Sequence, residues 1–450
     1  MGFATQTDNY RDHNNQVSNG IALQEGWDYS NGTLTVNEKS YNDIIQFPGA
    51  LSQAQYDQNP RQASDNKDYF HYQTQIFQLS NQNQLDSNWR LAIHASSTEV
   101  KNDGYFFNPI QGSENVLWLD SKLIGDFPGK KMTFGYTGEA SAYKNYADAN
   151  TSSTVNIGEN ELYIHNLFSL NPKWQLTLGA RGARQDNNPQ QTLTAAPYHY
   201  LNRVFVTEQG LNYLFSSNFF WYVRRAGNFR FPKANEEVWL PNNITELQPQ
   251  TGVSYETGLE WHTSRQKAQL NIYKLKLHNE LAYDPTETPE QPFGATTNFP
   301  ETIHKGISLT DDFNLNNKLG LNTEMNYVDA RFAQGANINK FIPAVPMWQG
   351  DANFHYQIND RWRWTYGEQY TGSQYVSEDI TNVSKKQSSY FLAKSSIQYF
   401  YRQFTFGMMV NNIFNQRYAT YAYYNLGDQS NYYYPASGRN YLFTFKASLA

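Results

Sequence analysis

Short polar turns and longer polar stretches alternate along the chain, and segments of alternating apolar and polar residues lie between them. The short turns are "DYSNGT" from Asp28, "DSNW" from Asp86, "PGKK" from Pro128, "NPKW" from Asn171, "SSN" from Ser216, "HTSRQ" from His262, "NLNNK" from Asn314, "INDR" from Ile358 and "FYRQ" from Phe400. The longer stretches are residues 45–68, 98–112, 143–157, 186–203, 228–250, 285–301, 334–349, 374–386 and 412–439. In an antiparallel meander, this order places the tight turns at one end and the long loops at the other, as in a transmembrane barrel with periplasmic turns and extracellular loops.

Each segment between the turns has one apolar and one hydrophilic face. Apolar side chains alternate with polar or small ones from Trp174 to Arg181, and again from Tyr441 to Leu449. A soluble β-sandwich has the same period, but about 20 such strands as hairpins, with aromatic residues near the strand ends and no helical segment, favour a barrel. We therefore predict an all-β fold over residues 1–450, an antiparallel up-and-down transmembrane β-barrel.

Composition narrows the class of protein. A mean hydropathy of −0.73 together with 16% aromatic residues is unusual, and a β protein with a polar interior explains both. The net charge of −6 argues against nucleic-acid binding, and the absence of cysteine excludes disulfides and thiolate chemistry. No apolar run is long enough for a membrane helix, and "MGFATQTDNYRDHNN" has no features of an export signal.

One segment breaks its alternation. In "AQLNIYKLKLHNELAY", Ile272 shares a face with Leu270, but the same parity then reaches Lys274 and Lys276. A β-bulge near Ile272 would restore the pattern; without one, the two lysines would face the bilayer, at a cost of about 2–4 kcal/mol each near its midplane.

Catalytic chemistry is not indicated. The chain has no G-x-S-x-G, H-E-x-x-H or phosphate-binding glycine motif, and its histidines are scattered singly. We expect no enzyme activity, no cofactor and no metal site.

The segment "VNNIFNQRYATYAYYNLGDQSNYYYPASGRNYLFTFKASLA" carries a family resemblance through Asn412, Phe414, Tyr418, Gly438 and Arg439. It resembles the last two strands and last extracellular loop of TonB-dependent outer-membrane receptors. "YVRRAGNFRFPKANEEVWL" and "LQPQTGVSYETGLEW" are similar to two further family segments, and "FPGALSQAQYDQNPRQAS" resembles a loop of iron-chelate receptors. The matching residues in the first two are Phe229, Arg230, Pro232 and Glu236, then Leu247, Pro249, Glu256 and Gly258.

The resemblance implies a monomer in the bacterial outer membrane, in contact with lipid and lipopolysaccharide, that imports a scarce bulky ligand with energy supplied through TonB. It also implies a plug domain and a barrel of about 22 strands. We expect this chain to lack the plug, the TonB-coupling box and the first hairpin. The closing strand then either pairs with the first strand of this chain or leaves the wall open.

The resemblance favours a ferric siderophore as ligand, with cobalamin, haem or another cofactor or metal chelate as alternatives. Loop aromatic residues and arginines suit an anionic ferric chelate because they supply stacking and charge-assisted hydrogen bonds. The candidate ligand-binding residues are Tyr10, Arg11, Arg184, Arg230, Phe231, Trp239, Tyr370, Tyr432, Tyr433 and Tyr434. A passive porin-like channel and a soluble all-β binding protein remain alternative functions.

Overall fold

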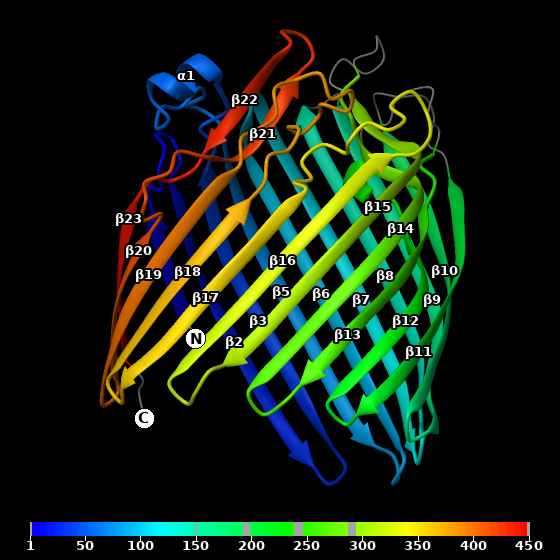
Figure 1. The fold of residues 1–450 in the computed structure, drawn as a ribbon. Coiled ribbons are helices and arrows are strands. Elements are labelled where there is room, and N and C mark those ends of the chain that lie inside the picture. The colour runs from blue at the N-terminus through cyan, green and yellow to red at the C-terminus, as the bar shows by residue number, and fades with distance from the viewer. Residues whose placement is uncertain (1, 149–150, 192–198, 238–245, 287–293, 448–450) are drawn as a thin grey trace.

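One antiparallel sheet dominates the computed structural model, which describes residues 2–148, 151–191, 199–237, 246–286 and 294–447. Twenty strands pair in chain order, except that β3 pairs with β5 and β20 pairs with β23. The strands are β1 (Gly2–Thr7), β2 (Gln16–Tyr29), β3 (Gly32–Gln46), β5 (Tyr69–Gln84), β6 (Trp89–Phe106), β7 (Asn108–Phe127), β8 (Lys130–Asp148), β9 (Thr151–Asn171), β10 (Trp174–Gln191), β11 (Tyr200–Ser216), β12 (Phe219–Arg230), β13 (Gln250–His262), β14 (Gln266–Asp284), β15 (Ala295–Asn314), β16 (Leu319–Phe332), β17 (Trp348–Asn359), β18 (Trp362–Thr371), β19 (Tyr390–Tyr401), β20 (Phe404–Asn411) and β23 (Asn440–Ala447). Figure 1 shows these strands tilted around the wall of a barrel, which confirms the predicted fold class.

The predicted tight turns are confirmed. Each lies between two paired strands, from the turn that joins β2 to β3 through the turn that joins β19 to β20. Asx-type hydrogen bonds hold several of them; in two cases the side chains of Asp86 and Asn171 accept the backbone N–H groups two and three residues ahead. All of these turns gather at one end of the barrel, as the sequence predicts (Figure 1).

Several predicted long loops prove to be strand instead. The stretch 98–112 is the end of β6, the start of β7 and a turn at Phe107, whose φ is +58°. The described residues of the stretches 143–157 and 186–203 likewise lie largely in β8, β9, β10 and β11. Beyond the membrane both faces of a strand meet water, so the apolar alternation stops while the backbone pairing continues. The prediction from hydropathy therefore made these strands too short at their loop ends.

Two short helices contradict the expectation of a chain without helix. Helix α1 (Gln53–Gln58) starts at a capping box, in which the Ser52 side chain accepts the Gln55 N–H and the Gln55 side chain accepts the Ser52 N–H. Helix α2 (Ala234–Glu237) follows Pro232. Neither helix is long or apolar enough to cross a membrane. Both are local loop structures, which a barrel-scale pattern does not reveal.

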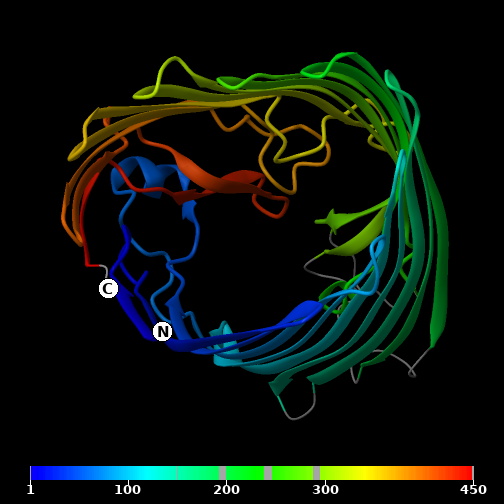
Figure 2. The ribbon, with the colours of Figure 1, turned by 90° about the horizontal axis from the view of Figure 1, so that it is seen from below.

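The first and last strands of the sheet differ from the rest. Within the described residues no pairing joins β1 to β23, and every residue of both strands is exposed. The two strands lie on the same side of the barrel (Figure 2). Of the two arrangements considered for the closing strand, the described residues therefore show the one without a β1–β23 pair.

Of the two alternatives for the segment around Ile272, the structure has the one without a bulge. Strand β14 pairs in continuous register with β13 and β15 from Lys267 through to His278. Lys274 and Lys276 therefore share the outward face with Ile272. Lys276 is neutralised there, because its Nζ lies 2.9 Å from a carboxylate oxygen of Glu301. The strand keeps its regular pairing and accommodates the charges on the outer wall.

Loops fold over and into the outer end of the barrel (Figure 2). One unit is a three-stranded sheet of β4 (Leu51–Ser52), β21 (Ala419–Asn425) and β22 (Ser430–Pro435). The other is the described start of the connection between β12 and β13, residues 231–237, which carries α2 and lies inside the wall (Figure 2). Fully buried side chains gather in and beneath these loops, among them Leu51, Val155, Leu247 and Val376. The apolar core is therefore at the outer end of the barrel.

Candidate ligand-binding site

Two loops far apart in the sequence meet at the barrel rim. Strand β22 pairs with β4, with Tyr432 opposite Ser52 and Tyr433 opposite Leu51. The ring of Tyr433 also stacks on Tyr56 of α1, with centroids 5.4 Å apart. We call this unit of β4, α1, β21 and β22 the rim clasp. It fixes the last loop of the chain against the loop that follows β3.

Arg11 anchors the same loop from below. Its side chain is 5% exposed, and its guanidinium donates to the carbonyl oxygens of Gly49, Pro48 and Gln62 at 2.6, 3.3 and 2.8 Å. Burial lowers the pKa of Arg11. The neighbouring Tyr10 lies under the guanidinium of Arg61, 5.6 Å from the ring centroid. Arg11, in the loop between β1 and β2, thus holds together the two ends of the loop that follows β3, at Pro48–Gly49 and at Gln62.

A hollow of about 920 Å³ opens between the rim clasp and the loop 383–385. Its lining residues are Ser52, Gln53, Ala54, Val383, Ser384, Lys385, Tyr424, Leu426, Asp428, Gln429, Ser430, Asn431, Tyr432 and Tyr433. We call it the rim hollow. The hydroxyl of Tyr432 donates to Asp428 at 2.5 Å, and this bond raises the pKa of Tyr432. The hollow therefore offers tyrosine faces, amides and the cationic Lys385.

Burial has a strong effect on the tyrosines beside this hollow. Tyr423 stacks on Tyr432 at 5.5 Å between ring centroids, and burial raises the pKa of Tyr423 to about 12. The pKa of Tyr434 is raised as well, chiefly by burial. These phenols stay protonated at neutral pH, so they offer hydrogen-bond donors and stacking surfaces.

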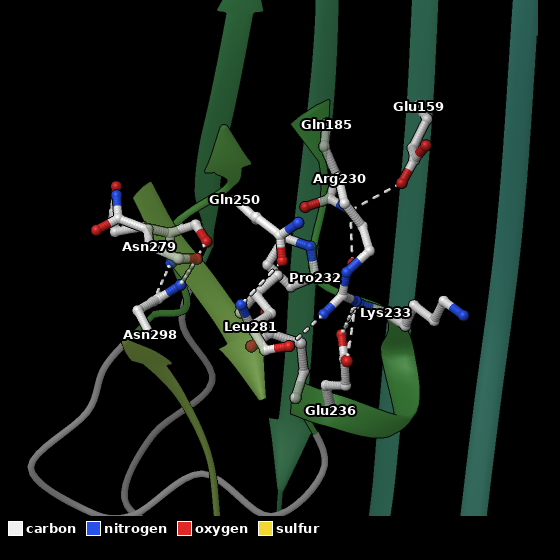
Figure 3. A network of polar contacts seen from close by, with 12 residues as sticks. Glu159, Gln185, Arg230, Pro232, Lys233, Glu236, Gln250, Asn279, Leu281 and Asn298 are labelled. Atoms are coloured by element: carbon white, nitrogen blue, oxygen red, sulfur yellow. Dashed lines mark hydrogen bonds and ion pairs between the residues drawn. The ribbon is translucent and has the colours of Figure 1, made fainter. Parts of the chain in front are cut away.

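The loop inside the barrel is held by the residues of the family-like F-R-x-P segment. Arg230 donates to both carboxylate oxygens of Glu236, at 2.9 and 2.8 Å, and to the carbonyl oxygen of Leu281 at 2.9 Å (Figure 3). Gln185 on the wall donates to the carbonyl oxygen of Pro232 at 2.8 Å. Leu247 and Pro249 of the second family-like segment are buried. These motif residues fasten the loop to the lumenal wall.

A buried carboxylate lies at the end of α2. Glu237 is fully buried and accepts a hydrogen bond from the hydroxyl of Tyr200, which in turn accepts one from Asn187 at 2.8 Å. Burial raises the pKa of Glu237 to about 8. Ala234 of the same helix packs against Val155 of β9. The helix is thus sealed against the wall with an acid that is largely neutral at pH 7.

A second hollow, of about 770 Å³, lies beneath the last loop on the lumenal side. We call it the lumenal hollow. Its lining includes Tyr10, Tyr418, Lys394, Asp351 and several asparagines. The hollow is polar, and acidic and basic side chains both line it. Together the two hollows give a capture surface at the rim and a wet compartment below it.

The predicted ligand-binding residues do not form one cluster. Tyr432 and Tyr433 line the rim hollow and Tyr10 lines the lumenal hollow, with Tyr434 in β22. Arg11, Arg230 and Phe231 are engaged in loop contacts, and Phe231 is 5% exposed. Trp239 lies outside the described residues.

Two more of the predicted residues face outward. Arg184 of β10 lies opposite Arg203 of β11. Arg203 is two residues from the exposed Phe205 and therefore on the same, outer face, so Arg184 also faces outward. Tyr370 lies opposite Phe391 on the outer face of β18 and β19. Alternation decides this placement, because one step along a strand moves a side chain to the other face.

The carboxyl-terminal motif closes the last loop on itself. Asn412, with φ +48°, donates to the carbonyl oxygens of Gln416 and Ser437 at 2.9 and 3.2 Å. Asn415 accepts the N–H of Arg439 at 2.9 Å, and a Cβ at Gly438 would lie 2.7 Å from that same side-chain oxygen. The motif residues therefore join the two ends of the loop, and their role in the structure is architectural.

Sequence reasoning missed Tyr56, Lys385 and Glu237. The capping-box spacing from Ser52 to Gln55 was a signal for α1 and hence for the exposed face that carries Tyr56. No comparable signal marks Lys385 or Glu237, because their roles depend on loops that meet only in three dimensions.

Comparison with known proteins agrees with this architecture. A family model described as "TonB dependent receptor-like, beta-barrel" matches residues 5–413. The ferric-catecholate import receptor Fiu from E. coli K12 aligns with a TM-score of 0.79 at 14% identity, over 99% of this chain and 76% of that one. The siderophore receptor PiuA from Acinetobacter baumannii gives 0.81 at 16% identity, over 99% and 76% of the two chains. The copper transporter OprC gives 0.81 at 12% identity, over 100% and 75%.

No curated protein matches the chain in sequence. At these identities the likeness to solved structures concerns the fold alone, whereas the family model covers most of the chain.

Proposed function

The chain belongs to the TonB dependent receptor-like β-barrel family, and on that premise we propose that it captures a ferric siderophore at the barrel rim for import driven through TonB. The family places the chain in the bacterial outer membrane as an integral β-barrel. It is a receptor family and the chain is not an enzyme. Membership also removes the soluble binding protein as an alternative and disfavours a passive porin.

The observation that carries the proposal is the rim hollow. It is large enough for a bulky chelate, it opens at the loop end of the barrel, and its lining includes Tyr432, whose ring stacks on Tyr423. Flat aromatic faces bind planar ligand groups by stacking, and tyrosine hydroxyls add directed hydrogen bonds. Lys385 supplies a positive charge for an anionic chelate.

Within the siderophore class, the balance of groups favours chelates with aromatic donors. Tyr424, Tyr432 and Tyr433 line the hollow, whereas Lys385 is the one cationic side chain in its described lining and Asp428 is acidic. A carboxylate chelate without aromatic rings offers no flat group to stack on these tyrosines. A catecholate or phenolate chelate matches the lining better, because stacking supplies much of its binding. Haem, cobalamin and other metal chelates are the competing ligands.

A binding screen tests the proposal. The purified chain in detergent is titrated with ferric catecholate, hydroxamate and carboxylate siderophores, haem and cobalamin, and quenching of intrinsic fluorescence reports binding. We expect the ferric catecholates to bind most tightly. Replacing Tyr432 by Ala should weaken that binding about tenfold or more, as removal of a stacking and hydrogen-bonding anchor does. Tyr370→Ala, on the outer wall, is the matched control and should bind as the unchanged chain does.

Three results would count against this proposal. If haem or cobalamin binds most tightly, the ligand is not a siderophore. If Tyr432→Ala binds as the unchanged chain does, the rim hollow is not the binding site. If the iron-free siderophore binds equally well, the protein does not recognise the ferric complex. The role of TonB is tested separately in cells that express the protein. There, uptake of the radiolabelled ferric complex should stop when TonB is deleted.

A further inference from the structure

The lumenal hollow continues down the inner wall of the barrel. A smaller hollow of about 300 Å³ shares Asn353, Gly367 and Lys394 with it. Together the two spaces reach from Asp351 to His355 on β17, which is about 13 Å at the usual rise of a strand. We call the combined space the lumenal groove. It is elongated along the strands, so it can hold a ligand longer than a single small molecule.

Register brings the middle of the groove together from four strands. Asn353 of β17 lies opposite Asn322 of β16 and opposite Gly367 of β18. Gly367 in turn lies opposite Lys394 of β19. Tyr370 is on the outer face of β18, so Gly367, three residues away, is on the lumenal face. The opposed residues share that face, and the four positions form one lumenal row.

The rows on either side of this one are polar as well. The loop-side row is Glu324, Asp351 and Gln369, and the turn-side row is His355, Thr365 and Ser396. The hydroxyls of Thr365 and Ser396 lie 2.7 Å apart, and the Asn353 amide donates to Asp351 at 2.9 Å. Carboxylates accept hydrogen bonds, an ammonium donates them, and amides and hydroxyls do both. The groove therefore offers donors and acceptors side by side along its whole length.

Gly367 leaves the centre of the groove open. A Cβ on Gly367 would lie 2.6 Å from Oδ1 of Asn353 and 2.8 Å from Cε of Lys394, so both side chains lean over its bare backbone. Within the part of the chain that the structure describes, the side chains of Lys394 and Gln369 have no hydrogen-bond or ion-pair partner. Their donors and acceptors point to a ligand in the groove.

Two tyrosines, Tyr10 and Tyr418, line the loop-side end. The ring of Tyr418 packs on Tyr390, with centroids 4.8 Å apart, which fixes its orientation. A tyrosine ring presents a flat apolar face next to a polar hydroxyl. Glu368 also borders the groove, but its side chain is on the outer wall, where it accepts the hydroxyl of Tyr366 at 2.7 Å.

We propose that the lumenal groove binds a short neutral oligosaccharide, as a second ligand besides the chelate of the rim hollow. Every sugar hydroxyl both donates and accepts hydrogen bonds, so it needs the mixture of amides, hydroxyls and carboxylates that these rows provide. The apolar C–H face of a sugar ring packs on a tyrosine face. Glu324 and Asp351 accept hydroxyls at the loop side, and together they repel an anionic sugar.

The test is isothermal titration of the full chain with trisaccharides. The detergent has a polyoxyethylene headgroup, because the sugar headgroup of a maltoside would compete for the groove. The neutral probes are maltotriose, cellotriose, mannotriose and N-acetylchitotriose; sialyllactose is the anionic comparison and the glucosamine trimer the cationic one. We expect at least one neutral trisaccharide to bind with a Kd below about 1 mM, and sialyllactose to bind about tenfold more weakly.

Two results of this titration would overturn the proposal. The first is that no neutral trisaccharide binds. The second is that a charged trisaccharide binds as tightly as the best neutral one or more tightly. In particular, preference for the glucosamine trimer would mean that Glu324 and Asp351 select a cation.

Gly367→Ala tests the place of binding. The added methyl pushes the side-chain ends of Asn353 and Lys394 into the groove, and both ends are flexible, so the strand keeps its pairing. Trisaccharide binding should fall about tenfold or more. The control is Gly26→Ala on β2, whose added Cβ has no neighbour closer than 3.9 Å. Asn353→Ala with Gln369→Ala removes two partners without adding volume and should weaken binding as well. Unchanged binding by these variants would contradict the proposal.

The proposal fails or holds independently of the chelate at the rim. Tyr432→Ala should keep trisaccharide binding, because Tyr432 lines only the rim hollow among the hollows described. Gly367→Ala should likewise keep ferric-catecholate binding. If either variant loses both ligands while remaining folded, the two hollows are one site and the groove has no ligand of its own.

Discussion

Tyr56 and Tyr433 stack with their ring centroids 5.4 Å apart, one in the loop after β3 and the other in the last loop of the chain. Beside this stack, β4 pairs with β22, so the backbones of the two loops are joined as well. The rim clasp therefore joins the loop after β3 to the last loop of the chain. It forms one side of the rim hollow.

Replacing Tyr433 by Ala should loosen the clasp. The stack contributes roughly 0.5–1.5 kcal/mol beyond simple area burial, so the loop 47–68 should open more often and become more sensitive to protease. Proteolysis rates of Tyr433→Ala, Tyr56→Ala and the double variant form a cycle that measures the coupling. If the effects of the two single variants simply add, the rings do not act as a pair.

Replacing Arg11 by Lys should free the same loop from below. A lysine cannot reach the carbonyl oxygens of Gly49, Pro48 and Gln62 together, because it lacks the planar fork of the guanidinium. The loss should be about 1.5–3 kcal/mol, and amide exchange at Ser64, whose N–H donates to Pro48 at 2.8 Å, should accelerate. Arg61→Lys, on the exposed side of Tyr10, is the control. Weaker ligand binding by Arg11→Lys with unchanged exchange would instead assign Arg11 to the ligand.

The barrel was predictable from the sequence, whereas the loops were not. Turn chemistry at positions such as Asp86 and Asn171 is local, and the two-residue period of strands such as β10 depends only on which face meets lipid. Both can therefore be read without knowing what lies nearby. Strand ends were misplaced because pairing continues into water, where hydropathy no longer alternates.

The site depends on non-local contacts. Arg230 was predicted to bind ligand, but its partners Glu236 and Leu281 come together only when the loop folds inside the wall. Arg184 and Tyr370 were chosen for residue type, and their outward placement follows from parity within long strands. Residue type suggested the chemistry of the site, and only the register of the sheet assigned each residue to the lumen or to lipid.

The loop that carries α2 should respond to pH through Glu237. Burial raises the pKa of this acid to about 8, so its neutral form is favoured in the folded loop. The stabilisation is complete below the ordinary carboxyl pKa of about 4.3 and is lost as pH rises through 8, at about 1.4 kcal/mol per pH unit within that window. The chain has no cysteine, so Lys233→Cys accepts a single spin label. The label should be immobile at pH 5 and mobile at pH 9.

Replacing Glu237 by Gln in the labelled chain should abolish that pH response, because the amide has no proton to lose. Glu25→Gln, on β2 and far from the loop, is the matched control and should keep the response of the unchanged chain. Equal mobility at pH 5 and pH 9 with Glu237 intact would show that the loop holds the ionised carboxylate without cost.

Gly438 should not tolerate a side chain. An added Cβ would lie 2.7 Å from the side-chain oxygen of Asn415, which accepts the Arg439 N–H at 2.9 Å. Gly438→Ala must displace Asn415 and break this closure, at a cost of about 1–3 kcal/mol typical of an overpacked site. Gly26→Ala is the control, since its added Cβ would have no neighbour closer than 3.9 Å. Heat-modified mobility on gels should show a lower unfolding temperature for Gly438→Ala alone, and equal temperatures for the two variants would mean that the last loop does not depend on this contact.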